Sequence, residues 1–515
     1  MISLAALILF SLTSFSNCKE YTFPDNFKFG VATSAYQVEG AWNVGGKGEN
    51  IWDYMTHTNP SSILDKSNGD IACDSYNKIK EDVQLLKNLG VDFYRFSISW
   101  SRILPSGKTE YINPDGIRYY NELIDELLAN NIEPLVTMHH FDLPQPLEEE
   151  GGFLNLAIAD YFEDYADVLY KNFGDRVKEW TTFNEPTPVC FLGYSGEFLA
   201  PMITRKDGGY LCGRTLLIAH AKAYHLYNKR YRASQKGRIG IVHNIFWFEP
   251  RTNSIKDLQA AEAANEFNFG WFANPIFSKE GDYPQIMKGS IEYASKQEGL
   301  PKSRLPELTQ EEIELIKGSA DFLGINHYTT FYCSPIEEEG IGKGLFYLPD
   351  MDANCVMDEK ADGSASFWLK VIPSGFRNSL NWIKEQYNNP EEQYNNPEVI
   401  ILENGISDDG NLLNDCLRVN YNNLYLTEML KAIHEDGCNV SGYAAWSFMD
   451  NFEWTSGYTQ KFGLYSVDFD DPARPRTPKM SAFVFKNIIQ ERKINWTYTP
   501  EGFGKCDGPK LKDEL

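Results

Sequence analysis

The chain has 515 residues, of which 42% are hydrophobic and 14% aromatic, so it can bury a large core. That length permits several small domains or one large α/β barrel with long loops. The formal net charge of −24 argues against a nucleic-acid partner, because the sequence has no excess of cations to neutralise a phosphate backbone.

Both ends of the chain carry predicted targeting signals. Residues 2–12 are mostly apolar and precede the small residues Ser14 and Ser16, a pattern typical of a secretory signal peptide. We assign residues 1–18 to that peptide, which is too short to cross a bilayer core of ~30 Å, and we expect no membrane span. The last four residues, Lys512-Asp513-Glu514-Leu515, form an endoplasmic-reticulum retrieval signal, so the KDEL receptor is an expected partner. The sequence predicts a protein kept in the lumen of the endoplasmic reticulum, or secreted where retrieval is incomplete.

Eight short apolar runs, most of them separated by helical segments, predict the strands of one sheet. They lie at residues 29–32, 93–98, 134–138, 177–183, 239–243, 322–325, 399–402 and 443–446. After the first run, Tyr76, Ile79, Val83 and Leu86 recur at helical spacing, and Gly90 supplies a C-terminal stop. Strands that alternate with helices pair in parallel, so eight such units predict an α/β fold, a closed (β/α)8 TIM barrel. The spacings exceed what a minimal barrel of ~250 residues needs, which predicts long βα loops around the barrel mouth.

The connections indicate one domain. No Gly/Ser-rich linker or charge block divides the chain, so we predict a single barrel domain over residues 19–500 and a tail over residues 501–515. Residues 385–391 are repeated immediately as residues 392–398, which we interpret as a tandem duplication in the connection before the seventh strand. Loop extension costs little free energy, so we expect no function for this repeat beyond reshaping one side of the mouth.

The nine cysteines are scattered, without a C-x-x-C pair, in a chain too large to need a disulfide framework. We expect most of them to be small core residues, although a lumenal protein could form one or two bridges, for instance Cys333 to Cys355. The histidines include no H-E-x-x-H motif, and His139 and His140 should point to opposite faces of a strand, so no metal site is expected. Glycosylation sequons begin at Asn439 and Asn495, and we expect the second to be the more exposed.

Two glutamates stand at the ends of predicted buried strands. Glu185 closes the run at residues 180–185 and precedes Pro186, while Glu403 closes the run at residues 399–403 and is followed by Asn404-Gly405. A carboxylate at the mouth of a buried strand is costly to place there and usually serves chemistry. Two of them form a candidate acid and nucleophile pair for breaking a glycosidic bond. The alternative is that each glutamate merely ends a strand at the surface.

Other predicted strand ends hold further polar and aromatic candidates. They are Gln37, Arg95, His140, Asn184, Tyr328, Trp446, Glu453 and Trp454. Taken singly, each has an ordinary structural explanation, such as a paired core cation or a packing aromatic. Strand ends of a barrel converge on one face, however, so residues far apart in the sequence can meet there. Their shared position on successive strands favours a binding site.

The sequence resembles glycoside hydrolase family 1, the β-glucosidase family, from about residue 23 to residue 496. The matching motifs lie at residues 23–27, 35–40, 94–100, 142–145, 182–186, 324–328, 403–405 and 446–454. The segments at residues 270–272 and 303–306 resemble insect members more than plant members. Several motifs in the right order over nearly the whole chain make this resemblance specific.

The resemblance implies a retaining mechanism without a cofactor. Glu403 would attack the anomeric carbon as the nucleophile while Glu185 protonates the departing oxygen, and Glu185 would then activate a water. Arg95 and the Tyr328 hydroxyl would stabilise the charged form of Glu403, whereas Glu185, beside that charge, would tend to keep its proton.

The resemblance also implies the residues that hold the sugar. Gln37, His140, Asn184, Glu453 and Trp454 would hydrogen-bond the hydroxyls of the glycone, and Trp446 would lie along its ring. A carboxylate at Glu453 would repel a 6-phosphosugar. This sequence departs from the family pattern at Phe141, where Trp is usual, and at Met202, where Gly is common. The first change puts the fine positioning of His140 in doubt.

These inferences predict a β-glycosidase that hydrolyses small-molecule β-D-glucosides. The alternative is a β-thioglucosidase, or myrosinase, that cleaves glucosinolates. Plant myrosinases carry Gln at the acid position, whereas insect myrosinases keep the acid. Glu185 therefore favours O-glucosides without excluding S-glycosides. A more remote alternative is an inactive sugar-binding relative. The aglycone pocket is expected in loops around Tyr194, Lys206, Phe246 and Trp247, and the sequence leaves the oligomeric state open.

Overall fold

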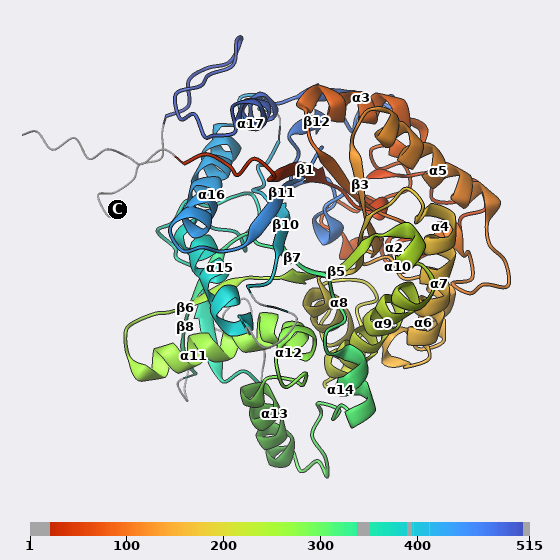
Figure 1. The fold of residues 1–515 in the computed structure, drawn as a ribbon, viewed down its shortest axis with the longest axis vertical. Helices are drawn as coiled ribbons and strands as arrows, with labels where there is room; N and C mark the ends of the chain where they lie inside the picture. The colour runs from red at the N-terminus through yellow and green to blue at the C-terminus, as the bar shows by residue number, and fades with distance from the viewer. Residues whose placement is uncertain (1–20, 337–349, 389–393, 395, 411, 508–515) are drawn as a thin grey trace, which may run out of the picture.

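A computed structural model describes residues 21–336, 350–388, 394, 396–410 and 412–507 (Figure 1). The predicted signal peptide, the retrieval signal and residues 389–393 and 395 of the repeat lie outside the described residues. No described helix is both long and apolar enough to cross a membrane.

Eight strands close into a barrel in the order β1-β11-β10-β7-β5-β4-β3-β2. They are β1 (Lys28–Ala32), β2 (Phe93–Ser97), β3 (Glu133–His139), β4 (Glu179–Asn184), β5 (Arg238–Asn244), β7 (Phe322–Asn326), β10 (Val399–Asn404) and β11 (Val440–Trp446). All neighbours pair in parallel. Each predicted apolar run overlaps one of these strands, which confirms the (β/α)8 barrel. The strands are nearly continuous apolar runs because helices outside and side chains inside cover both faces.

A ring of helices surrounds the barrel (Figure 1). Its long members are α3 (Ile79–Leu89), α5 (Pro114–Ala129), α7 (Ile158–Phe173), α9 (Gly208–Arg230), α15 (Ser374–Tyr387), α16 (Cys416–His434) and α17 (Met480–Glu491). Helix α3 illustrates why these segments are helical: Val83, Leu86 and Leu89 form its buried face. Gly90 ends it with φ of 86°, a left-handed conformation that glycine adopts at little cost.

Most other elements sit in the long βα loops, as predicted. The shorter helices are α1 (Ala35–Val38), α2 (Ile51–Thr58), α4 (Trp100–Ile103), α6 (Gln145–Glu149), α8 (Pro186–Tyr194), α10 (Arg232–Gln235), α11 (Ile255–Asn265), α12 (Trp271–Phe277), α13 (Gln285–Gln297) and α14 (Gln310–Ile316), with a π-helical turn η4 (Glu266–Gly270) and 3₁₀ turns η1 (Pro60–Ser62), η2 (Ser75–Asn77), η3 (Gly152–Leu154) and η5 (Trp454–Ser456). One small sheet consists of β6 (Trp247–Pro250), β8 (Thr330–Pro335) and β9 (Ala353–Val356). Another consists of β12 (Tyr465–Val467) and β13 (Arg476–Pro478). The surplus length therefore builds the rim of the barrel mouth.

Six of the nine cysteines are buried in the core, as expected, but among the described cysteines only Cys73 and Cys438 are free. Three disulfides form among the described residues: Cys190–Cys212, Cys333–Cys355 and Cys416–Cys506. The predicted Cys333–Cys355 bridge is confirmed, and the other two were missed. The bridges tie α8 to α9, β8 to β9, and the C-terminal segment to α16, so they fasten loops and surface segments while the barrel core needs none.

The heptad repeat begins inside a helix, so the interpretation of it as a pure loop extension is wrong. Tyr387 in the first copy is the last residue of α15, and its hydroxyl donates to Asn274 Oδ1 over 2.6 Å. Tyr394, at the same position of the second copy, is also buried, and its hydroxyl donates to the carbonyl of Ala320 over 2.8 Å. Both tyrosines therefore anchor the repeat to neighbouring elements.

Candidate active site

The candidate site is a cavity of about 430 Å³ at the carboxyl ends of the barrel strands. Eight of the predicted site residues line it: His140, Asn184, Glu185, Tyr328, Glu403, Trp446, Glu453 and Trp454. The other two, Gln37 and Arg95, are fully buried and contact residues of the cavity wall. The structure therefore brings all ten predicted residues together.

The backbone turns sharply where β4 delivers Glu185. Strand β4 ends at Asn184, and Glu185 adopts a left-handed φ of 48°, a conformation that costs of order 1–3 kcal/mol for such a residue. The Glu185 N–H still donates to the carbonyl of Val242 over 2.8 Å, so the residue stays attached to β5. Pro186 then begins α8, where its missing N–H is harmless. This turn places a buried carboxyl group in the cavity wall.

Two donors hold the carboxylate of Glu403 at the end of β10. Arg95 Nη1 donates to Glu403 Oε1 over 2.5 Å, and the Tyr328 hydroxyl donates to Glu403 Oε2 over 2.7 Å. Arg95 lies on β2 and is completely buried, so its charge faces Glu403 without solvent screening. Each carboxylate oxygen thus has its own donor, as the sequence predicts for an ionised group.

The electrostatic environments of the two glutamates differ. Burial, and then the charge of Glu403, raise the pKa of Glu185 to about 8. Burial also raises the pKa of Glu403, but the Arg95 guanidinium and the Tyr328 hydroxyl act in the opposite direction. Of the two, Glu403 is therefore the group that is ionised near neutral pH, and Glu185 is the group that keeps a proton.

Asn326 connects the two glutamates, although the sequence did not single it out. It ends β7, and its Nδ2 donates to Glu185 Oε1 over 2.8 Å and to Asn184 Oδ1 over 3.0 Å. The same amide helps to lower the pKa of Glu403. Its position inside the matching motif at residues 324–328 was the available signal, because it is the polar residue that closes an apolar strand.

Asn184 has a fixed orientation. Its Oδ1 accepts from Arg95 Nη2 over 2.6 Å as well as from Asn326, and its Nδ2 lies 3.1 Å from His140 Nε2. The carbonyl side of the amide is therefore used by the protein. The Nδ2 group has a second hydrogen, which is the one available to a ligand in the cavity.

His140 is held firmly even though Phe141 replaces the usual tryptophan. Its ring lies nearly parallel to Trp446 and Trp454, with ring centroids 5.9 Å apart in both pairs. Burial and the nearby Arg95 charge keep the pKa of His140 well below 6.5, so the ring is neutral. Its Nδ1 is buried and makes no hydrogen bond to a described residue, and the residue itself lines the cavity.

Gln37 organises the segment that carries Glu453. Its Nε2 donates to the carbonyl of Phe452 over 2.9 Å, to Asn451 Oδ1 over 3.0 Å and to Glu453 Oε2 over 3.3 Å. Its Oε1 accepts from the Ser34 hydroxyl over 2.7 Å. Burial raises the pKa of Glu453 to about 8, helped by the charges of Glu403 and Glu185. Glu453 is therefore mostly neutral at pH 7, and its charge is a weaker argument against 6-phosphosugars than the sequence suggested.

The described residues hold no group of three or more His, Cys, Asp or Glu that could bind a metal ion. His139 is separated from His140 as predicted, because it packs edge-on against Phe153 and Phe183 while His140 faces the cavity.

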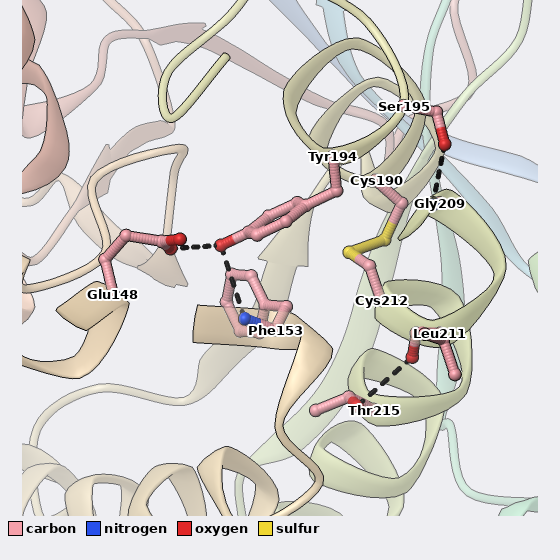
Figure 2. The surroundings of a disulfide bond; sticks show 9 residues. All are labelled: Glu148, Phe153, Cys190, Tyr194, Ser195, Gly209, Leu211, Cys212 and Thr215. Carbon is pink, nitrogen blue, oxygen red and sulfur yellow. Dashed lines mark hydrogen bonds between the residues drawn. A yellow bond between two sulfur atoms is a disulfide. The ribbon is translucent and has the colours of Figure 1, made fainter. Parts of the chain in front are cut away.

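Only one of the four residues expected around the aglycone lines the cavity. Phe246 does. Tyr194 turns the other way, and its hydroxyl donates to Glu148 and accepts from the Phe153 N–H (Figure 2). Lys206 is exposed and pairs with Glu298, and Trp247 lies in β6. The remaining apolar wall comes from residues that the sequence did not indicate: Pro188, Leu192, Phe198, Leu199, Phe367, Trp368 and Phe462.

A (β/α)8 barrel with a protonated and an ionised carboxyl group at its mouth has the arrangement of a glycoside hydrolase. Comparison with known proteins agrees: the glycosyl hydrolase family 1 model matches residues 19–494, so the chain belongs to that family. Myrosinase 1 of Brevicoryne brassicae is 47% identical over 484 residues, which cover 92% of this chain and 100% of that protein. The cytosolic β-glucosidase of Cavia porcellus is 42% identical and covers 92% of this chain and 99% of its own.

The solved structures agree with the fold. The structure of an aphid myrosinase superimposes with a TM-score of 0.86 at 47% identity and covers 91% of this chain and 99% of its own. The barrel, the carboxyl pair and the family together establish a β-glycosidase, which confirms the activity predicted from the sequence.

Proposed function

We propose that this protein hydrolyses β-D-glucosides with uncharged, apolar aglycones, through a glycosyl-enzyme intermediate. The observation that carries the choice of aglycone is the cavity wall. Beyond the carboxyl groups it is mostly aromatic and aliphatic, and no Lys or Arg is among the described residues that line it. A glucosinolate carries a sulfate anion that would lie in this wall without a cationic partner, and an unpaired charge in a buried site is costly. The wall therefore favours O-glucosides over glucosinolates.

The geometry supports a double displacement. Glu403 attacks the anomeric carbon and forms an ester bond to it, while Glu185 gives its proton to the glycosidic oxygen, whose bond to that carbon breaks. Glu185, now ionised, takes a proton from a water that attacks the same carbon and displaces Glu403. Each step leaves one of the two carboxyl groups protonated or esterified, so the site never has to hold both charges at once.

The remaining predicted residues have consistent roles in this proposal. Trp446 would provide an apolar face for the sugar ring, and His140, Asn184 and Glu453 are polar residues of the same wall that would lie near its hydroxyls. Trp454 lies nearly parallel to the His140 ring and lines the same cavity. Gln37 acts by holding the segment of Glu453, since its own polar atoms are engaged by the protein.

The first experiment compares initial rates of the purified enzyme on an aryl β-glucoside and on a glucosinolate, with Glu403→Gln as the control. Fast cleavage of the aryl glucoside and slow cleavage of the glucosinolate is the expected result. The reverse order would make the protein a thioglucosidase like the aphid relative and would refute the argument from the cavity wall. Binding without cleavage of either would support the inactive sugar-binding alternative.

We also propose that the protein resides in the lumen of the endoplasmic reticulum and is recognised there by the KDEL receptor. The apolar N-terminal segment and the C-terminal Lys512-Asp513-Glu514-Leu515 support this location. Three disulfides agree with an oxidising compartment. Of the two sequons, Asn439 is exposed and Asn495 is half-buried, the reverse of the expectation, so Asn439 is the better candidate for a glycan. A mobility shift on glycosidase treatment that is lost in Asn439→Gln tests this assignment.

A further inference from the structure

A second cavity of about 480 Å³ adjoins the catalytic cavity. It is lined by Asn59, Ser62, Glu197, Phe198, Met202 and Thr455. Phe198 and Thr455 also line the catalytic cavity, so the two spaces meet at these residues. A ligand that extends from the catalytic carboxyl groups past Phe198 therefore enters the second space, which we call the outer cavity.

The chemistry changes along this path. The wall of the catalytic cavity combines the carboxyl groups with apolar residues that include Leu192, Leu199, Phe246 and Trp368, and Leu192 and Leu199 lie next to Phe198, where the outer cavity begins. In the outer cavity it becomes polar again, with an amide, two hydroxyls and a carboxyl group around the Phe198 ring, which is 63% exposed. A matching ligand has the same order: a sugar, an apolar unit and a second hydroxylated unit.

The polar groups of the outer cavity are oriented by the protein. Glu197 Oε1 accepts from the Thr204 hydroxyl over 2.9 Å, which fixes the carboxylate. Asn59 Oδ1 accepts from the Ser61 hydroxyl over 2.7 Å, so its Nδ2 is the side of the amide that remains to donate. The backbone carbonyl of Thr455 accepts from Leu64 over 2.8 Å and so joins the two loops of the rim. The rim thus offers an acceptor and a donor, both on exposed side chains, to a bound group.

We propose that the outer cavity is a second sugar subsite, which holds a glycosyl unit attached to the far end of an apolar aglycone. An exposed aromatic ring surrounded by short donors and acceptors suits a sugar, which has an apolar face and hydroxyls at its edge. No Lys or Arg is among the six lining residues, and Glu197 disfavours anions, so a sulfate or phosphate is not the expected occupant. This inference rests on the proposed β-glucosidase activity, because it names the substrate class of the same site.

The test uses three substrates that share a reacting β-glucoside and a phenyl ring. The ring carries at its far end either a free hydroxyl, an α-glucosyl unit that the enzyme does not cleave, or a sulfate. We expect kcat/KM for the glucosyl-extended substrate to exceed that for the hydroxyl substrate by about tenfold, the effect of one or two added hydrogen bonds. Glu197→Ala and Asn59→Ala should remove this advantage and leave the rate on the hydroxyl substrate unchanged. Glu307→Ala, at an exposed acid outside both cavities, is the matched control and should keep the advantage.

Equal rates on the two uncharged substrates, or an advantage that survives both alanine variants, would overturn the subsite. A preference for the sulfated substrate would overturn its assignment to an uncharged unit. Calorimetric binding to the Glu403→Gln protein separates this proposal from the proposed function. Tighter binding of the glucosyl-extended compound supports the subsite even if hydrolysis fails, and equal binding refutes the subsite even if hydrolysis is fast.

Discussion

Replacing Tyr328 by phenylalanine should shift one limb of the pH–rate profile. The hydroxyl donates to Glu403 Oε2 over 2.7 Å, and no other hydrogen bond of that hydroxyl is present among the described residues. Such a bond to a charged group contributes ~1.5–3 kcal/mol. One pKa unit corresponds to ~1.36 kcal/mol, so the pKa of Glu403 should rise by about one to two units in Tyr328→Phe.

The sign of the effect follows from the role of Glu403. The nucleophile must be ionised, so activity is lost as the pH falls through its pKa, and raising that pKa moves the acidic limb to higher pH. The basic limb belongs to Glu185, whose pKa is about 8, and should stay in place. The profile therefore narrows from its acidic side only. It is measured as kcat/KM for an aryl β-glucoside between about pH 3 and 9, since this quantity reports the pKa values of the free enzyme.

Tyr425→Phe is the matched control for this change. Its hydroxyl is also buried, but it donates to the backbone carbonyl of Tyr328 and accepts from the Ile372 N–H, so it touches neither carboxyl group. We expect no shift of the acidic limb in this variant. An acidic limb that does not move in Tyr328→Phe, or that moves equally in Tyr425→Phe, would refute the assignment of that limb to Glu403.

Four further predictions follow from the same contacts. Glu185→Gln should abolish the basic limb and lower kcat/KM for alkyl glucosides by ~10²–10⁴-fold while sparing kcat/KM for dinitrophenyl glucoside, whose leaving group needs no acid. Turnover of dinitrophenyl glucoside should fall because water is no longer activated, and azide should restore it and yield a β-glucosyl azide; equal losses of kcat/KM on both substrates would contradict the role. Glu453→Gln should lower kcat/KM at pH 7 by about 2- to 13-fold, the effect of one hydrogen bond to a neutral group, without moving the basic limb; a displaced limb would assign that limb to Glu453 instead. Cys212→Ser removes a disulfide between residues 22 apart and should lower the free energy of unfolding, measured by denaturant titration, by about 3.4 kcal/mol. Cys438→Ser, at an unpaired cysteine, should lower it by less. Deletion of residues 512–515 should move the protein from the cell to the medium, and unchanged retention would exclude the KDEL receptor as the cause.

The barrel and its catalytic pair could be predicted because both depend on local patterns. A parallel strand covered on both faces is a continuous apolar run, so all eight strands stand out in the sequence. Glu185 and Glu403 stand out because a carboxyl group at the end of such a run has no structural reason to be there. Asn326 followed the same rule and was overlooked, since an amide at a strand end is less conspicuous than a charge.

The disulfides and the aglycone wall could not be predicted because they depend on the paths of long loops. Cys190 and Cys212 meet because α8 turns back against α9, which no spacing in the sequence reveals (Figure 2). Tyr194 follows one turn after Cys190 on the same helix and faces Glu148, away from the cavity. Sequence proximity to the acid made it a reasonable candidate, and the rotation of the helix decided otherwise.

The buried cation Arg95 determines which of three carboxyl groups in the site is ionised. Glu185, Glu403 and Glu453 all contribute to one cavity wall, and Arg95 lies directly behind it. Three ionised carboxylates beside one guanidinium would leave two uncompensated charges in a site largely shielded from water. The pKa values of Glu185 and Glu453 therefore rise to about 8, while Arg95 favours the charged form of Glu403. The residue that pairs with the cation is thereby the nucleophile, and its neighbours are left as proton donors. A cationic sugar analogue should consequently bind more tightly as the pH rises through 8, because ionisation of Glu185 or Glu453 then adds a carboxylate that is not already paired with Arg95.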